Sequence, residues 1–170
     1  MAITIIVEDG TGVANANSYI SEAAARVFAE SVGLPLPVDS EACKAALLAA
    51  MPYLESQPWQ GQRSDPTQAL SWPRKLVIIN GDELPNNIVP QNIQKAQVQA
   101  ASMGSTGTDL FPTISGQFVT KEKVGPIETE YSDEYLQTWD GRSIFSAIDV
   151  YLTPYLNWVG GYRLSPAFGF

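Results

Sequence analysis

The side chains that could perform catalysis in this sequence are carboxylates, hydroxyls and one thiol. Adjacent acidic pairs stand at positions 8–9, 82–83 and 133–134, and each lies beside turn-forming residues, where acidic side chains are usually solvated. Cys43 falls on the apolar stripe of a predicted helix, and the 170-residue chain has no histidine to activate it, so packing in the core is its expected role. The lack of histidine also excludes Ser-His-Asp and Cys-His catalysis. We therefore expect neither an enzyme nor a metal or cofactor site.

A second group of residues has the composition of a surface for single-stranded DNA, on which aromatic rings stack on bases and cations contact phosphates. Its members are Trp59, Arg63, Trp72, Arg74 and Lys75. The charge of the whole chain argues against this role, because 18 acidic and 10 basic residues give a net charge of −8, whereas phosphate-driven binding needs a basic surface. The interpretation that we favour is that the two tryptophans anchor a long connection onto the helices.

Length and composition limit the alternatives further. A chain of 170 residues fits a single domain, residues 1–170, and one cysteine cannot form an internal disulfide. Charged residues make up 16% of the chain, against roughly 25% in typical soluble domains, which indicates a surface partly covered by partners. The sequence contains neither a targeting segment nor an apolar run long enough to cross a membrane, so we expect no membrane partner.

The elements that must position these residues include four predicted helices. The first starts after Ser18 or Ser21 and ends before Gly33, because the serines can cap and the glycine can terminate a helix. The others are predicted at about 39–54, 90–103 and 143–155. The residues predicted to share the apolar face of the first helix are Ala24, Val27, Phe28 and Val32, and those of the second helix are Cys43, Ala46, Leu47, Ala50, Met51 and Leu54.

Extended segments are predicted at 3–7, at 76–79 before a tight turn at 80–81, and most clearly at 117–131. In this last segment polar and apolar residues alternate on both sides of a Gly-Pro turn at 125–126. The alternation predicts a β-hairpin across which lysines can face glutamates. Together the patterns predict a mainly α fold, a small bundle of about four helices with a protruding β-hairpin, long loops and an extended C-terminal tail at about 160–170.

Three features of this organisation favour an assembly protein over an enzyme. A protruding hairpin offers strand edges that a neighbour can pair with or cover. The tail is rich in tyrosine and phenylalanine but has no periodicity, which is typical of an arm that orders on a partner. The low charge content is expected where much of the surface lies between subunits.

Three strings of the sequence resemble a family of tailed-phage proteins labelled DnaT-like single-stranded DNA-binding proteins. They are VEDGTG at 7–12 with ANSYIS at 16–21, then TQALSWPR at 67–74, and KEKVGPIETEY at 121–131. The similarity extends over about residues 5–156. The order of the elements also resembles that of the helical head–tail adaptor proteins, in which a small helical bundle with a β-hairpin assembles as a ring beneath the portal.

The resemblance implies a structural virion protein that forms an adaptor ring, expected to be a twelve-fold ring matching the portal. Its partners would be other copies of itself, the portal protein, and a tail stopper or tail tube protein. Duplex DNA would pass through the bore without sequence-specific binding, which suits an acidic chain because sliding DNA must not adhere. Its location would be the portal vertex or neck of the virion, and the host cytoplasm during assembly.

Two groups of site residues follow from this interpretation. The hairpin residues expected at the subunit interface are Lys121, Lys123, Val124, Ile127, Glu128, Glu130 and Tyr131. The tail residues expected to dock on the portal are Tyr162, Arg163, Leu164, Phe168 and Phe170. The alternative function is binding of single-stranded DNA in phage replication, through the aromatic and cationic residues between positions 59 and 75.

Overall fold

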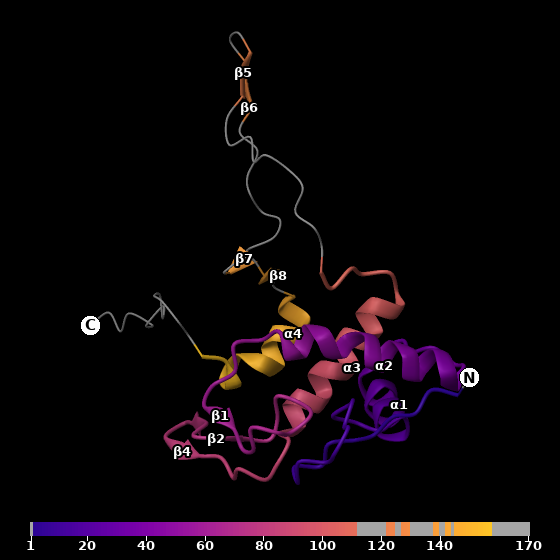
Figure 1. The fold of residues 1–170 in the computed structure, drawn as a ribbon. Coiled ribbons are helices and arrows are strands. Elements are labelled where there is room, and N and C mark those ends of the chain that lie inside the picture. The colour runs from indigo at the N-terminus through magenta and orange to yellow at the C-terminus, as the bar shows by residue number, and fades with distance from the viewer. Residues whose placement is uncertain are drawn as a thin grey trace.

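The fold is mainly α with β-hairpins, as the sequence predicts (Figure 1). The computed structural model describes residues 2–111, 122–124, 127–129, 138–139, 142–143 and 145–157. Within these ranges lie four α-helices, α1 (Glu22–Val32), α2 (Ser40–Glu55), α3 (Gln91–Ser105) and α4 (Ser146–Leu152), with a 3₁₀ turn, η1 (Thr153–Tyr155), after α4. Helix α3 is central, since it packs against each of the other three helices. No helix in the described ranges is long and apolar enough to span a membrane.

The predicted ends of the first two helices are confirmed. The Ser21 hydroxyl accepts a hydrogen bond from the backbone N–H of Ala24 at 3.2 Å, and Gly33 ends α1 in the left-handed conformation. A carboxylate oxygen of Asp39 accepts from the N–H of Ala42 at 2.8 Å at the start of α2. Because each cap satisfies a backbone group that the helix cannot satisfy itself, short-range sequence signals are sufficient to place these ends.

The buried faces of the two helices were predicted with different success. In α2 the predicted stripe is confirmed, since Ala46 is half-buried against the core and the other five predicted residues are buried: Cys43, Leu47, Ala50, Met51 and Leu54. In α1 the prediction holds only for Phe28, which is half-buried against the core. It is wrong for Ala24, which is exposed, and for Val27 and Val32, which are 70% and 51% exposed, because the buried residues are Ala25 and Ala29. Small side chains on the inner face let α1 approach its neighbours closely, and the larger valines are left outside.

Within the described residues, four short antiparallel ladders occur in the segments that connect the helices along the chain. In the loop between α2 and α3, β1 (Gln62–Arg63) pairs with β2 (Arg74–Lys75), and β3 (Ile78–Ile79) pairs with β4 (Asp82–Glu83). The predicted turn between β3 and β4 is confirmed, because Asn80 and Gly81 both have positive φ. The strand predicted at 76–79 is shorter than expected, since Leu76, at a φ of 61°, interrupts it. At the N-terminus, the extended segment predicted at 3–7 makes one parallel bridge, Val7 to Ser18.

The predicted hairpin is present as β5 (Glu122–Val124) and β6 (Ile127–Thr129), which lie away from the helices in Figure 1. Its register places Lys123 opposite Glu128 and Val124 opposite Ile127, as the alternation predicts. Lys121, Glu130 and Tyr131 lie outside the described residues. A further ladder, β7 (Thr138–Trp139) with β8 (Arg142–Ser143), was not predicted from the sequence.

A buried carboxylate holds the turn in the N-terminal segment by accepting hydrogen bonds from its backbone. Glu8 is fully buried, and its oxygens accept hydrogen bonds from the backbone N–H groups of Gly10, Gly12 and Val13 at 2.9, 2.8 and 2.8 Å. Gly10 has a φ of 105°, and a Cβ atom there would lie 2.2 Å from the carbonyl oxygen of Asn87. The sequence VEDGTG therefore folds as a turn around its own glutamate, pressed against the segment that leads into α3.

Replacing Gly10 by alanine is expected to destabilise the protein by more than about 2 kcal/mol, because both the backbone conformation and the contact with Asn87 are incompatible with a Cβ atom. Gly12→Ala is the matched control. Gly12 also has a positive φ, but a Cβ atom added there would meet no other group within 4 Å, so a loss of about 1 kcal/mol is expected. Urea unfolding followed by circular dichroism measures both, and equal losses would contradict the proposed contact.

Candidate functional site

The two tryptophans of the candidate DNA surface lie in the core. Trp72 is fully buried and Trp59 is 7% exposed. Their rings meet edge to face with centroids 5.7 Å apart, and Tyr155 of η1 packs edge to face on Trp72 at the same separation. Neither indole is accessible to a nucleobase in this conformation. The prediction that these tryptophans anchor the long connection between α2 and α3 is confirmed.

The loop is tied to α2 by a partly buried hydrogen-bond network centred on Glu55, the last residue of that helix. One carboxylate oxygen of Glu55 accepts from the Tyr19 hydroxyl. The other accepts from the backbone N–H and the hydroxyl of Ser71 at 2.9 and 2.8 Å. The Tyr19 hydroxyl oxygen in turn accepts from the N–H of Trp72 at 3.2 Å. Burial, reinforced by the nearby Glu55 carboxylate, raises the pKa of Tyr19 well above its usual value, so the phenol remains a donor at physiological pH.

A second buried polar side chain, Gln97 of α3, joins three segments that are distant in sequence. Its amide oxygen accepts from the N–H of Tyr19 at 2.9 Å. Its amide nitrogen donates to the Ser18 hydroxyl at 2.8 Å and to the Leu47 carbonyl of α2 at 3.0 Å. Sequence reasoning missed this residue; the available signal was a glutamine between the apolar positions Ala96 and Val98.

Arg74, a candidate phosphate contact, is engaged inside the loop. Its Nε and two Nη atoms donate to the backbone carbonyls of Gln60 at 2.6 Å, Ser71 at 3.1 Å and Gly61 at 2.9 Å. Burial, together with repulsion from the cationic Arg63, lowers the pKa of Arg74. With three of its five N–H donors used, Arg74 acts mainly as a clamp that holds β2 against the start of the loop.

The remaining cations of the candidate surface are accessible. Arg63 is exposed on β1, and Lys75 is half-buried on β2. The ladder places Arg63 opposite Arg74. Among the described residues the ion pairs are Arg26 with Glu22 and Lys44 with Glu41, so neither Arg63 nor Lys75 forms a close ion pair there. The charge of Lys75 nevertheless contributes to lowering the pKa of the Asp65 carboxyl. The exposed Arg63 is therefore the more available of the two for an anionic group of a partner.

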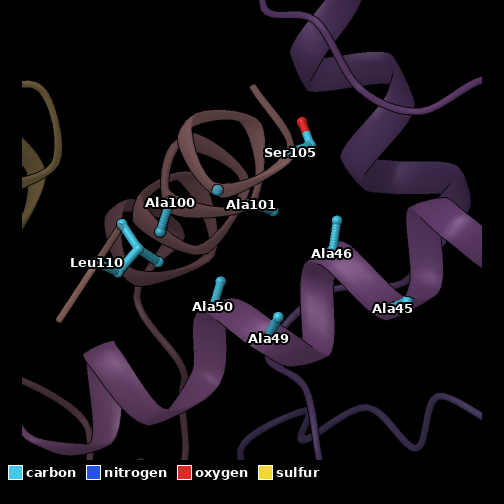
Figure 2. A pocket seen from close by; sticks show the side chains of 9 residues that line it. Ala45, Ala46, Ala49, Ala50, Ala100, Ala101, Ser105 and Leu110 are labelled. Atoms are coloured by element: carbon cyan, nitrogen blue, oxygen red, sulfur yellow. The ribbon is translucent and has the colours of Figure 1, made fainter. Parts of the chain in front are cut away.

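The cavity between α2 and α3 has one polar side chain in its lining, Ser105 (Figure 2), whose hydroxyl donates to the Ser102 carbonyl at 2.8 Å. It measures about 270 Å³ and is lined by small or apolar residues, among them Ala46 and Ala50 of α2, Ala101 of α3, and Leu110. Cys43 is fully buried, as predicted, and burial raises the pKa of its thiol. No three Cys, Asp or Glu side chains in the described ranges are grouped closely enough to hold a metal ion.

Helix α4 carries a carboxylate that is poorly compensated. The Tyr53 hydroxyl donates to one oxygen of Asp149 at 3.3 Å. The other oxygen is buried and has no hydrogen-bond partner among the described residues. Burial raises the pKa of Asp149 above its usual value. The protonated acid therefore fits this site beside α2 better than the carboxylate does.

Comparison with models of protein families gives one family for nearly the whole chain. Residues 3–165 match the family described as "Putative DnaT-like ssDNA binding protein". No curated protein and no solved structure matches the chain. The matched range includes each of the three strings on which the resemblance rests: the N-terminal string at 7–21, the string at 67–74 in the loop between α2 and α3, and the string at 121–131 that contains the β5–β6 hairpin.

Removing the Tyr19 hydroxyl is expected to weaken the attachment of the loop to α2 while the aromatic ring still fills its place in the core. In Tyr19→Phe, the Glu55 carboxylate and the Trp72 N–H each lose a buried partner, which typically costs about 1–3 kcal/mol in total stability. The measurement is the free energy of unfolding in urea together with Trp fluorescence. Tyr151→Phe, at a half-buried ring on α4, is the control and should cost less than about 1 kcal/mol; a loss of the same size in both variants would contradict a special role for Tyr19.

Asp149→Asn is expected to stabilise the protein at pH 7 by up to about 1 kcal/mol, because the amide does not carry the buried charge. The gain should shrink as the pH falls through the raised pKa of Asp149 toward about 3.9, its value in the unfolded chain. Above its folded-state pKa the ionised carboxyl of Asp149 destabilises the fold. Below its unfolded-state pKa the carboxyl is protonated in both states, and its charge no longer costs stability. Urea unfolding at several pH values gives the free energy of unfolding of the wild type and of Asp149→Asn. The other carboxylates are the same in both proteins, so their contributions cancel in the difference.

Asp65→Asn is a control of opposite sign. Hydrogen bonds from the side chain and backbone of Thr67 lower the pKa of Asp65. Replacing the Asp65 carboxylate by an amide should therefore destabilise the protein at neutral pH and have little effect in acid. A pH-independent gain from Asp149→Asn would contradict the assignment of the effect to this carboxyl group.

Proposed function

The chain belongs to the family of DnaT-like single-stranded DNA-binding proteins, and from this premise we propose that it is a DNA-associated structural protein of a tailed phage. In this proposal, copies of the chain form an adaptor ring between the portal and the stopper or tail. The bore of the ring leaves a passage for duplex DNA. The chain then meets DNA as a conduit rather than by enclosing single strands.

The burial of Trp59 and Trp72 is the observation that carries this proposal. Non-specific single-strand binders combine a basic groove with aromatic rings on which bases stack. Here the candidate rings pack on each other and on Tyr155, and Arg74 donates to backbone carbonyls. The net charge of −8 further disfavours tight binding to phosphates and favours a channel along which DNA slides.

The β5–β6 hairpin supports the assembly side of the proposal. Its two strands pair only with each other among the described elements, which leaves backbone groups on the outer edges for a neighbouring subunit. The order of elements, helices followed by a hairpin and a last helix, is also the order that the resemblance to head–tail adaptors implies. We propose that the hairpin residues Lys123, Val124, Ile127 and Glu128, with their neighbours at 121, 130 and 131, contact the adjacent subunit.

The C-terminal tail completes the proposed set of contacts. Its aromatic residues at 162, 168 and 170, with Arg163 and Leu164, lie outside the described residues. We propose that they dock on the portal, so truncation after Gly161 should weaken binding to the portal and leave the helical body folded.

Binding of single-stranded DNA in replication is the second candidate function, and the family description favours it. With the tryptophans buried, the accessible groups of the candidate surface are Arg63 and Lys75. Two phosphate contacts give a slope of roughly −1.4 in a plot of log K against log salt concentration. Fluorescence anisotropy with labelled oligonucleotides tests this, with Arg63→Glu and Lys75→Glu as variants.

Imaging of the portal vertex in purified virions at residue resolution distinguishes the two candidates. Density for this chain as a ring between portal and tail supports the adaptor. If the chain is found in infected cells but not in virions, and binds oligonucleotides with the salt dependence expected for its two accessible cations, the adaptor proposal fails and the replication role replaces it.

Replacing Ile127 by aspartate is expected to block ring formation, because it puts a charge on the strand that is proposed to meet the neighbour. Tyr131→Asp should act in the same way. Native mass spectrometry and electron microscopy measure the assembly, and circular dichroism should show unchanged helix content. The control is Val150→Asp, at a 67% exposed position of α4. Normal rings from Ile127→Asp would contradict the role of the hairpin.

A further inference from the structure

The turn between β3 and β4 carries the one Asn-Gly pair of the sequence, Asn80-Gly81. Both residues are exposed, and their φ values are positive, 54° and 97°. They form the two-residue connection between Ile79 and Asp82, which are partners in the ladder. Asn-Gly is favoured in such turns because both residues adopt positive φ at little cost. The turn therefore explains why this pair is present, but the same pair also has a chemical reactivity.

An asparagine before a glycine is open to attack by the backbone nitrogen that follows it. The Gly81 nitrogen gives up its proton to solvent and bonds to Cγ of Asn80, which closes a five-membered succinimide ring. The Cγ–Nδ2 bond breaks, and the nitrogen takes up a proton and leaves as ammonia. Water then opens the ring. Addition of water at Cγ gives aspartate, whereas addition at the main-chain carbonyl gives isoaspartate, whose main chain is one carbon longer.

The structure leaves both reacting groups of this turn free. A Cβ atom added to Gly81 would meet no other group within 4 Å, so no other described segment crowds the residue on that side. Neither the Asn80 side-chain amide nor the Gly81 N–H forms a hydrogen bond with another described residue. Rotation of the Asn80 side chain toward the Gly81 nitrogen therefore breaks no interaction within the described part of the chain.

The ladder that holds the turn is short. It pairs two residues of β3 with two of β4, and both residues of β4 are exposed at the periphery of the helical body (Figure 1). One further hydrogen bond follows, from the N–H of Leu84 to the carbonyl of Val77 at 2.9 Å. An isolated two-stranded ladder is marginally stable in water, so local opening of this turn requires little free energy. Opening frees the backbone to reach the geometry that ring closure needs.

Asn17, which precedes Ser18, has the opposite environment. Its amide oxygen accepts a hydrogen bond from the N–H of Ile6 at 2.8 Å, and its amide nitrogen donates to the carbonyl of Thr4 at 3.0 Å. Ser18 is fully buried and bridges to Val7. Attack by the Ser18 nitrogen would require these interactions to break together. The fold therefore protects Asn17 and leaves Asn80 open.

We propose that Asn80 is a site of spontaneous covalent modification, at which the folded protein loses ammonia and acquires isoaspartate and aspartate. The longer main chain of isoaspartate does not fit a two-residue turn. The new carboxylate also stands beside Asp82 and Glu83, where like charges repel. Modification therefore opens the β3–β4 ladder. This inference is independent of the proposed function, because it concerns the chain by itself.

Ageing of the purified full-length protein tests the proposal. Samples are incubated in mildly alkaline buffer at physiological temperature, either folded or in urea, and then digested for mass spectrometry with fragmentation that distinguishes isoaspartate from aspartate. Asn80 should react in the folded protein at a rate within about ten-fold of that in the unfolded chain, because local opening costs little. Folding should slow the reaction of Asn17 by more than about ten-fold. Equal protection of the two asparagines, or stronger protection of Asn80, would overturn the proposal.

Two variants test the effect of the modification on the ladder. Asn80→Gly keeps a residue that tolerates positive φ and removes the reactive amide, so its urea midpoint should not change on ageing, whereas that of the wild type should fall. Asn80→Asp adds the charge without the extra main-chain carbon and should lose less stability than the aged wild type. An unchanged midpoint in wild-type protein that contains isoaspartate would contradict the opening of the ladder. An equal loss in fresh Asn80→Asp would contradict the role of the longer main chain.

Discussion

The carboxylate of Glu55 is the group on which the arrangement of the chain depends. It stands at the C-terminal end of α2, where the helix dipole disfavours negative charge, and it is partly removed from water. Such a group is tolerated only when donors are fixed around it. Tyr19 and Ser71 supply those donors, so the segment before α1 and the loop after α2 are held where the carboxylate requires them. The loop in turn places Trp72 in the core.

Gln97 extends the same principle to the other side of the core. Its two amide donors and its acceptor oxygen connect α3 to α2 and to the N-terminal segment. A fully buried amide with one missing partner would be costly, so the three segments must meet in one geometry. The half-buried Glu55 and the buried Gln97 thus give this small helical bundle a single way to arrange its long connections.

The strings that carry the family resemblance are largely used within the fold. VEDGTG folds around the carboxylate of Glu8, and the serine, tryptophan and arginine of TQALSWPR are buried or hydrogen-bonded to the loop itself. These residues therefore identify a structure more directly than they identify a ligand. Functional contacts are better sought among the side chains that the fold leaves exposed, such as the apolar residues of β3 and of the outer face of α1.

The sequence by itself determined the features that depend on neighbouring residues: the helix caps at Ser21 and Asp39, the buried stripe of α2, the turn at Asn80-Gly81 and the register of β5 with β6. It also favoured the anchoring role of the tryptophans over base stacking. Only the tertiary structure decided which face of α1 is buried, that Gln97 joins three segments and that Arg74 is occupied by carbonyls. These outcomes depend on which surfaces meet across long sequence separations, and the energy of a buried polar group or a close helix contact is set by its partner rather than by its neighbours in the chain.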